Sequence, residues 1–130
     1  MKTTGLLTAL AACLMATGAL AERRLCTIQD GADAPLNPPE VLFDYEPGSG
    51  SATVMHSWYD GPLTHELDVA ETDRQWRMLA TVQARGTNGT ATLHIYMTYF
   101  PPRDSMTVTV RIGNNWGNMP SRADYSCAPA

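Results

Sequence analysis

The feature that most constrains this chain is a strict alternation of apolar and polar residues in its second half. Apolar side chains occupy every second position over 76–84 and again over 91–99. A period of two is typical of β-strands with one buried face. Between the two runs lies Asn88-Gly89, the dipeptide most favoured in two-residue hairpin turns. With this turn Ala84 would oppose Leu93 and every opposed pair on that face would be apolar, so we predict a hairpin in this register.

A second predicted hairpin spans residues 52–69 around Asp60-Gly61. A two-residue turn at this dipeptide would place His56 directly opposite His65 on the apolar face. Pro62 lacks the N–H that closes such a turn. A four-residue loop, which shifts the two histidines apart, is therefore the alternative.

Four further segments predict additional strands, namely 25–29, 41–46, 106–112 and 122–127. The connections between the eight predicted strands are short, which favours an antiparallel meander. We therefore predict a small all-β domain, folded as an antiparallel barrel of about eight strands. A two-sheet β-sandwich is the alternative.

The first 21 residues have the pattern of a secretory signal peptide, with a positive start, an apolar run and a small-residue cleavage site at Ala19-Leu20-Ala21. The predicted organisation is a signal peptide over 1–21 and a single β domain over 22–130, periplasmic or secreted. A lipoprotein anchored at Cys13 is the less favoured alternative, because residues 14–20 stay apolar where a lipidated cysteine usually leads into a polar tether. No later apolar run is long enough to span a bilayer.

Removal of the signal peptide leaves two cysteines, Cys26 and Cys127, near opposite ends of the mature chain. In an oxidising compartment they are expected to form a disulfide that joins the termini. The first and last strands of an eight-stranded up-and-down barrel are antiparallel neighbours. The expected disulfide therefore agrees with the expected barrel.

Charge is distributed unevenly along the chain. Residues 25–73 hold ten acidic residues and no Lys or Arg, whereas residues 74–122 hold six arginines and one acid. One interpretation is an acidic surface for a basic partner. We favour the other, in which strands from the two halves interleave in space and their charges cancel locally. With nine basic against thirteen acidic residues, the overall balance has the wrong sign for a nucleic-acid partner.

Residues that could carry chemistry are sparse. His56 and His65 are weak candidates for metal ligands, because the sequence offers no third ligand beside them. The serines lie in no nucleophile motif, and the mature cysteines are expected to be paired. We therefore predict no catalytic residues and no cofactor, and we expect a binding protein rather than an enzyme.

Aromatic residues give better candidates for contact with a partner. Trp116 lies in a predicted loop rich in Asn and Gly, where an exposed tryptophan is a common contact residue. Its alternative role is to fold back and cover one end of the barrel. Tyr96 and His94 share the polar face of the predicted hairpin with Arg77, and these three residues are further contact candidates.

The expected architecture is similar to that of the small periplasmic barrels, closed by a terminal disulfide, that inhibit lysozyme. Their Ser-Gly loop motif is matched here by Ser49-Gly50 within the segment 48–52, but no matching tyrosine follows nearby. The resemblance is therefore one of fold, which does not by itself imply function.

The function we expect is that of an exported, non-enzymatic binding or inhibitor-type protein. Its partner would be another exported protein or a cell-envelope component, contacted by the loops around Gly48 and Trp116. One alternative is a small-ligand carrier with a barrel cavity. Another is a histidine-dependent metal protein or hydrolase. The sequence contains no feature that specifies an oligomeric state.

Overall fold

The computed structural model describes residues 22–29, 34, 36–58, 61–86, 89–113 and 120–130. The predicted signal peptide, the alternative lipid anchor at Cys13 and the candidate contact residue Trp116 lie outside these residues.

The described residues form nine β-strands and one short 3-10 helix. The strands are β1 (Glu22–Ile28), β2 (Glu40–Tyr45), β3 (Ser51–Trp58), β4 (Gly61–Asp68), β5 (Ala70–Glu71), β6 (Trp76–Gly86), β7 (Gly89–Phe100), β8 (Ser105–Ile112) and β9 (Ser121–Pro129), and the helix is η1 (Pro101–Arg103). Within this part of the chain, no helix has the length and apolar character that a bilayer crossing requires.

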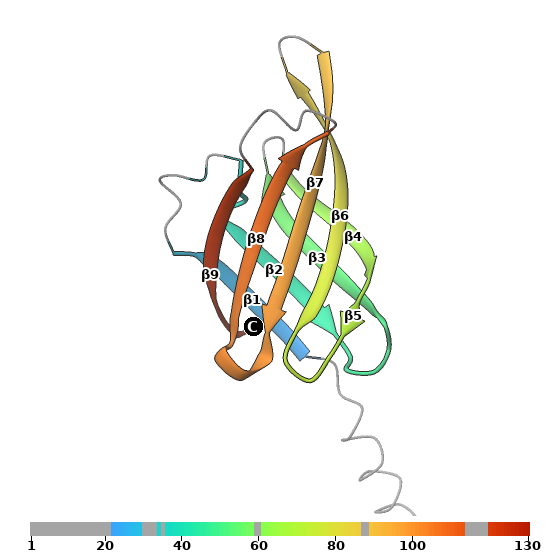
Figure 1. The fold of residues 1–130 in the computed structure, drawn as a ribbon, viewed down its shortest axis with the longest axis vertical. Helices are drawn as coiled ribbons and strands as arrows, with labels where there is room; N and C mark the ends of the chain where they lie inside the picture. The colour runs from blue at the N-terminus through green and yellow to red at the C-terminus, as the bar shows by residue number, and fades with distance from the viewer. Residues whose placement is uncertain (1–21, 30–33, 35, 59–60, 87–88, 114–119) are drawn as a thin grey trace, which may run out of the picture.

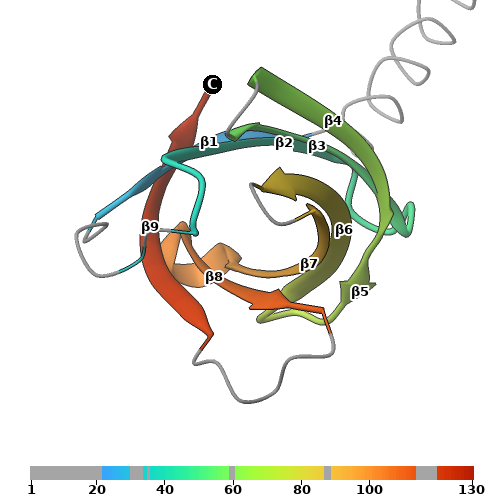
Figure 2. The same cartoon turned by 90° about the horizontal axis from the view of Figure 1, so that it is seen from above.

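The nine strands form one antiparallel sheet in the order β4-β3-β2-β1-β9-β8-β7-β6-β5. The sheet curls into a nearly closed barrel, which Figure 1 shows from the side and Figure 2 from above. The predicted all-β antiparallel barrel is confirmed. The additional strand is β5, a two-residue element that follows β4 after Val69 and pairs with the start of β6.

The predicted disulfide is also confirmed. Cys26 on β1 and Cys127 on β9 are directly opposed in the ladder between the two strands, and their sulfur atoms are bonded. Cys26 is fully buried. The disulfide therefore fastens the first strand to the last at the place where they pair.

The predicted register of the β6–β7 hairpin is wrong by two residues. Ala84 opposes Ala91 rather than Leu93, and the closing pair is Gly86 with Gly89. Gly89 has a φ of +117° and is the first residue of β7, not the second residue of the turn. Because a shift by two keeps each side chain on its face, the predicted inner and outer faces still hold.

The register of the β3–β4 hairpin matches neither of the two predicted loops. His56 opposes Leu63, His65 opposes Val54, and Trp58 opposes Gly61. Pro62 is therefore a residue of β4, opposite Ser57. Non-bonded pairs alternate with bonded pairs in an antiparallel ladder, so a missing N–H is harmless at a position that points away from β3.

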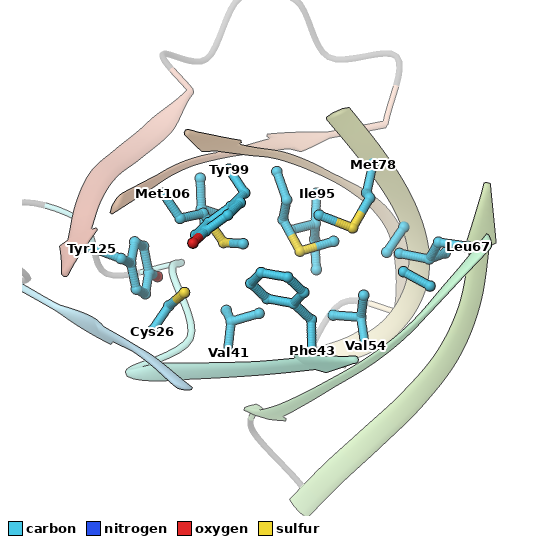
Figure 3. Packing of buried hydrophobic residues seen from close by; sticks show 14 of the residues in the cluster. Cys26, Val41, Phe43, Val54, Leu67, Met78, Ile95, Tyr99, Met106 and Tyr125 are labelled. Carbon is cyan, nitrogen blue, oxygen red and sulfur yellow. The ribbon is translucent and has the colours of Figure 1, made fainter. Parts of the chain in front are cut away.

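Apolar side chains fill the barrel interior, as Figure 3 shows for residues from opposite walls of the barrel. Phe43 packs edge-on against Tyr99 with ring centroids 4.9 Å apart, and Tyr45 packs against Trp76 at 4.7 Å. The largest fully buried side chains include Ile95, Met97, Met106, Tyr125 and four valines. This dense packing makes the barrel a rigid support for residues on its outer face.

The segment before β2 packs into the barrel, with Ala34, Asn37 and Pro38 buried. The Asn37 side-chain amide donates to the Val108 carbonyl at 2.9 Å and accepts a hydrogen bond from the Ser121 hydroxyl at 2.6 Å. These bonds satisfy a buried amide and fix the segment against β8 and β9.

Candidate functional site

Three of the four predicted contact residues lie together on the outer face of the β6–β7 hairpin. Along β6, the side chains at even-numbered positions from Trp76 to Val82 are buried, so Arg77 points outward. The same alternation on β7 places His94 and Tyr96 outside. The three residues belong to three consecutive outward pairs of the ladder, namely Arg77 with Thr98, Leu79 with Tyr96, and Thr81 with His94.

The centre of this outer face is apolar. Tyr96 is 40% exposed and lies directly opposite Leu79, which is 47% exposed. These are the two exposed large hydrophobic residues of the described part of the chain. Contiguous exposed apolar surface rimmed by polar residues marks contact surfaces. We refer to Leu79, Tyr96, Arg77 and His94 as the β6–β7 face.

Sequence reasoning missed Leu79 as a candidate. The available signal was its odd-numbered position, which places it on the outward side of β6. It is the one large aliphatic residue on that otherwise polar side. The next outward pair along the ladder, Thr81 with His94, is polar, and the Thr81 hydroxyl lies 3.5 Å from Nδ1 of His94.

A shallow, open depression adjoins the β6–β7 face where β4 leads into β5. Its lining combines Leu79, Tyr96 and Arg77 with Asp68, Val69 and Ala70. An apolar floor between a carboxylate and a guanidinium is suited to contact with a side chain of a partner. Below the depression, the Tyr45 hydroxyl and the Gly48 N–H donate to the Glu71 carboxylate, which ties β5 to the turn after β2.

The expectation that the charged halves of the chain interleave is wrong. Strands neighbour one another in sequence order around the barrel, so β2–β5 form one side and β6–β9 the other. Outward positions on β2–β4 carry Glu40, Asp44, Glu66 and Asp68, of which Asp44 is paired with Arg23 of β1. Those on β6–β9 carry Arg77, Arg111 and Arg122 with Asp124. The barrel therefore has an acidic side and a basic side, and the β6–β7 face lies on the basic one.

The weak metal candidates are close neighbours in the barrel interior. Nε2 of His56 lies 3.1 Å from Nε2 of His65, and the rings stack with centroids 5.1 Å apart. Burial, and secondly the neighbouring His65, lowers the pKa of His56 to about 4, and burial also lowers the pKa of His65. Both rings are therefore neutral near pH 7. Among the described residues, no third His, Cys, Asp or Glu joins them in a group that could hold a metal ion.

Gly48 and the described residues on either side of Trp116 lie at opposite ends of the barrel. The turn at Gly48 follows the end of β2 and is bonded to Glu71 of β5. The residues that flank Trp116 in the structure are Gly113 and Pro120, at the opposite end, where β8 ends and β9 begins.

Comparison with protein-family models, with curated proteins and with solved structures gives no match. The assignment of function therefore depends on the geometry of the barrel and its outer surface.

Proposed function

We propose that this chain is an exported, non-enzymatic binding protein that contacts another exported protein or a component of the cell envelope through the β6–β7 face. The observation that carries this proposal is the exposed pair of Leu79 and Tyr96 on a rigid, disulfide-closed barrel. Tyrosine and arginine are enriched among the residues that dominate binding energy at protein interfaces. Arg77 beside Tyr96 fits that composition.

Site-specific photo-cross-linking tests the proposal. A benzophenone amino acid is placed at Tyr96, and in a control at Met55, which alternates with buried residues on β3 on the acidic side. We expect irradiation in the exported compartment to give a discrete adduct from position 96 and none of the same mass from position 55. Identical adducts from both positions, or none from position 96, would refute a binding role for this face.

A second candidate function, that of a histidine-dependent metal protein or hydrolase, is favoured by the 3.1 Å approach of His56 and His65. A metal that binds the folded state raises the melting temperature, by an amount that grows with the logarithm of its concentration relative to its Kd. Zinc or copper should then raise the melting temperature of the wild type, but not of His56→Gln. A melting temperature that is the same with metal and with chelator would exclude this candidate.

The remaining alternative is a carrier for a small ligand. Native mass spectrometry of the protein from its own compartment tests it, because a bound molecule adds mass that is lost on denaturation. The packed side chains in Figure 3 support the scaffold proposal instead. We therefore expect the native mass of the bare mature chain.

A further inference from the structure

The barrel closes by hydrogen bonding around most of its circumference but not between β4 and β6. The sheet ends at β4 on one side and at β5 on the other. The β5–β6 ladder comprises only the pairs Ala70 with Arg77 and Glu71 with Trp76. From Met78 onward, β6 has no second ladder partner within the described part of the chain. We call this boundary between β4 and the upper part of β6 the seam.

The direction of the backbone groups along β6 follows from the turn that precedes it. The Thr72 N–H donates to the Gln75 carbonyl at 2.8 Å, so these opposed residues are a bonded pair. Bonded pairs recur every second residue in an antiparallel ladder, so Arg77 directs its N–H and C=O toward Ala70 on β5. Alternation then aims the backbone groups of the next odd-numbered residues into the seam, namely those of Leu79, Thr81 and Gln83.

The same reasoning applies to β4. The Val69 N–H donates to the Gly50 carbonyl at 2.9 Å, in register with the β3–β4 ladder. Even-numbered residues of β4 therefore direct their backbone groups into the seam. Three of these are Pro62, Glu66 and Asp68.

The two edges at the seam differ in their protection against strand pairing. Proline and charged side chains are the usual devices that prevent an exposed edge from pairing with another chain. On β4, Pro62 removes a donor and Glu66 and Asp68 supply charge. On β6, residues 78–84 contain no proline and no charged side chain. One edge is blocked, and the other is an uncharged row of donors and acceptors.

We propose that the open edge of β6 binds an extended segment of a protein partner, which adds to the sheet as a further strand. This inference rests on the proposed function and names its mode of binding. Backbone hydrogen bonds at Thr81 and Gln83 supply the affinity, and side chains at alternate positions supply the selectivity. Leu79 and Tyr96 lie beside the segment on the outer surface.

The surroundings of the seam define the chemistry of the segment. Its inward side chains face Val82, Ala84 and Leu63 of the interior wall, of which Ala84 and Leu63 are only partly buried, so apolar residues fit there. Its outward side chains lie between the edge of β6, which is uncharged over 78–84, and the Glu66 carboxylate, whereas Asp68 shares the depression with Arg77. The segment should therefore alternate apolar residues with polar ones that include Lys or Arg.

A displayed library of random ten-residue peptides, selected against the disulfide-intact mature protein, tests this mode. Thr81→Pro removes the N–H that faces the seam while leaving the β6–β7 ladder bonds, which belong to the even-numbered residues. Thr81→Ala is the matched control, because it keeps the N–H. We expect synthetic copies of the selected peptides to bind Thr81→Pro at least about tenfold more weakly than wild type and Thr81→Ala within about twofold.

Hydrogen exchange on the wild type provides a test that does not depend on any variant. The amides of Leu79, Thr81 and Gln83 should exchange rapidly in the free protein and become protected with the peptide bound. Those of Ala80 and Val82, bonded to β7, should be protected in both states. Equal peptide affinity for Thr81→Pro and Thr81→Ala, or unchanged exchange at the odd-numbered amides, would overturn the inference.

Two outcomes separate this inference from the proposed function. Peptides that lose binding to Tyr96→Ala but not to Thr81→Pro would leave the β6–β7 face as a contact surface and overturn strand addition. A dimer of the purified protein that dissociates on Thr81→Pro would identify the occupant as a second copy and would overturn the assignment to a separate partner.

Discussion

His56 and His65 bring their Nε2 atoms within 3.1 Å of each other although neither residue opposes the other in the β3–β4 ladder. They are diagonal neighbours on the inner face, and their rings stack on each other across the ladder. One Nε2 donates to the other, so the contact requires at least one neutral ring. Protonation of both rings would place two cations at hydrogen-bond distance inside the barrel.

The first prediction is that acid destabilises the protein through this pair. The pKa of His56 is about 4 in the folded protein and 6.5 when exposed. Between these values the unfolded chain binds more protons, so stability is complete above pH 6.5 and falls as the pH approaches 4. The full shift corresponds to a loss on the order of 3 kcal/mol.

Urea unfolding at pH 7.5 and pH 4.5 measures this effect. The free energy of unfolding of wild type should fall between the two values, and that of His56→Gln should fall less, because glutamine does not titrate. His65→Gln should also reduce the dependence, since it removes the neighbouring charge. The same loss of stability in wild type and His56→Gln would contradict the prediction.

The second prediction concerns the disulfide. Cys26 and Cys127 are 101 residues apart in sequence, so the bond restricts the unfolded chain strongly. The chain-entropy account gives a stabilisation of about 4–5 kcal/mol for a loop of this length. Replacing both cysteines by alanine should retain the strand content by circular dichroism, because the β1–β9 backbone ladder remains, and should lower the urea midpoint. A midpoint equal to that of wild type would show that the barrel does not depend on the bond.

The pattern of the sequence predicted which face each side chain occupies but not which residues oppose one another. A shift of two residues leaves the inner and outer faces of β6 and β7 unchanged, so alternation cannot distinguish the register closed by Gly86 and Gly89 from the one predicted. The same ambiguity hid the diagonal contact of His56 with His65.

Other features needed the order of strands in space. β5 has only two residues, Ala70 and Glu71, and both are exposed, so it has no apolar alternation from which a strand could be predicted. The separation of charge follows from the sequential strand order. The sequence predicted this order as a meander, but the prediction for the charges did not take it into account. Leu79 became a candidate only when its exposure and its position opposite Tyr96 were known.

The third prediction concerns the segment that packs into the barrel before β2. The buried Asn37 amide bonds both the Val108 carbonyl and the Ser121 hydroxyl. Asn37→Ala would leave both partners buried without this amide, at a cost of about 1–3 kcal/mol each at most. Ser121→Ala removes one of these two bonds and the longer 3.4 Å bond that its hydroxyl accepts from the Leu36 N–H. It should still cost less than Asn37→Ala, because it deletes fewer buried atoms. Thermal unfolding of the two variants measures the difference, and a larger loss for Ser121→Ala would contradict this view of the network.

The last prediction concerns Asp104, which has a φ of +47° after η1 and accepts a hydrogen bond from the buried Tyr99 hydroxyl at 2.5 Å. Asn tolerates the left-handed conformation and offers a carbonyl oxygen to the hydroxyl, so Asp104→Asn should have a small effect on stability.

Asp104→Leu should be much more costly, since it combines a left-handed backbone penalty of about 1–2 kcal/mol with an unpaired buried hydroxyl. Asp104→Gly separates the two contributions, because glycine relieves the backbone while losing the bond. The order of stability should be wild type, Asn, Gly and then Leu, measured by urea unfolding at pH 7. A Gly variant less stable than the Leu variant would show that the left-handed backbone does not contribute to the cost.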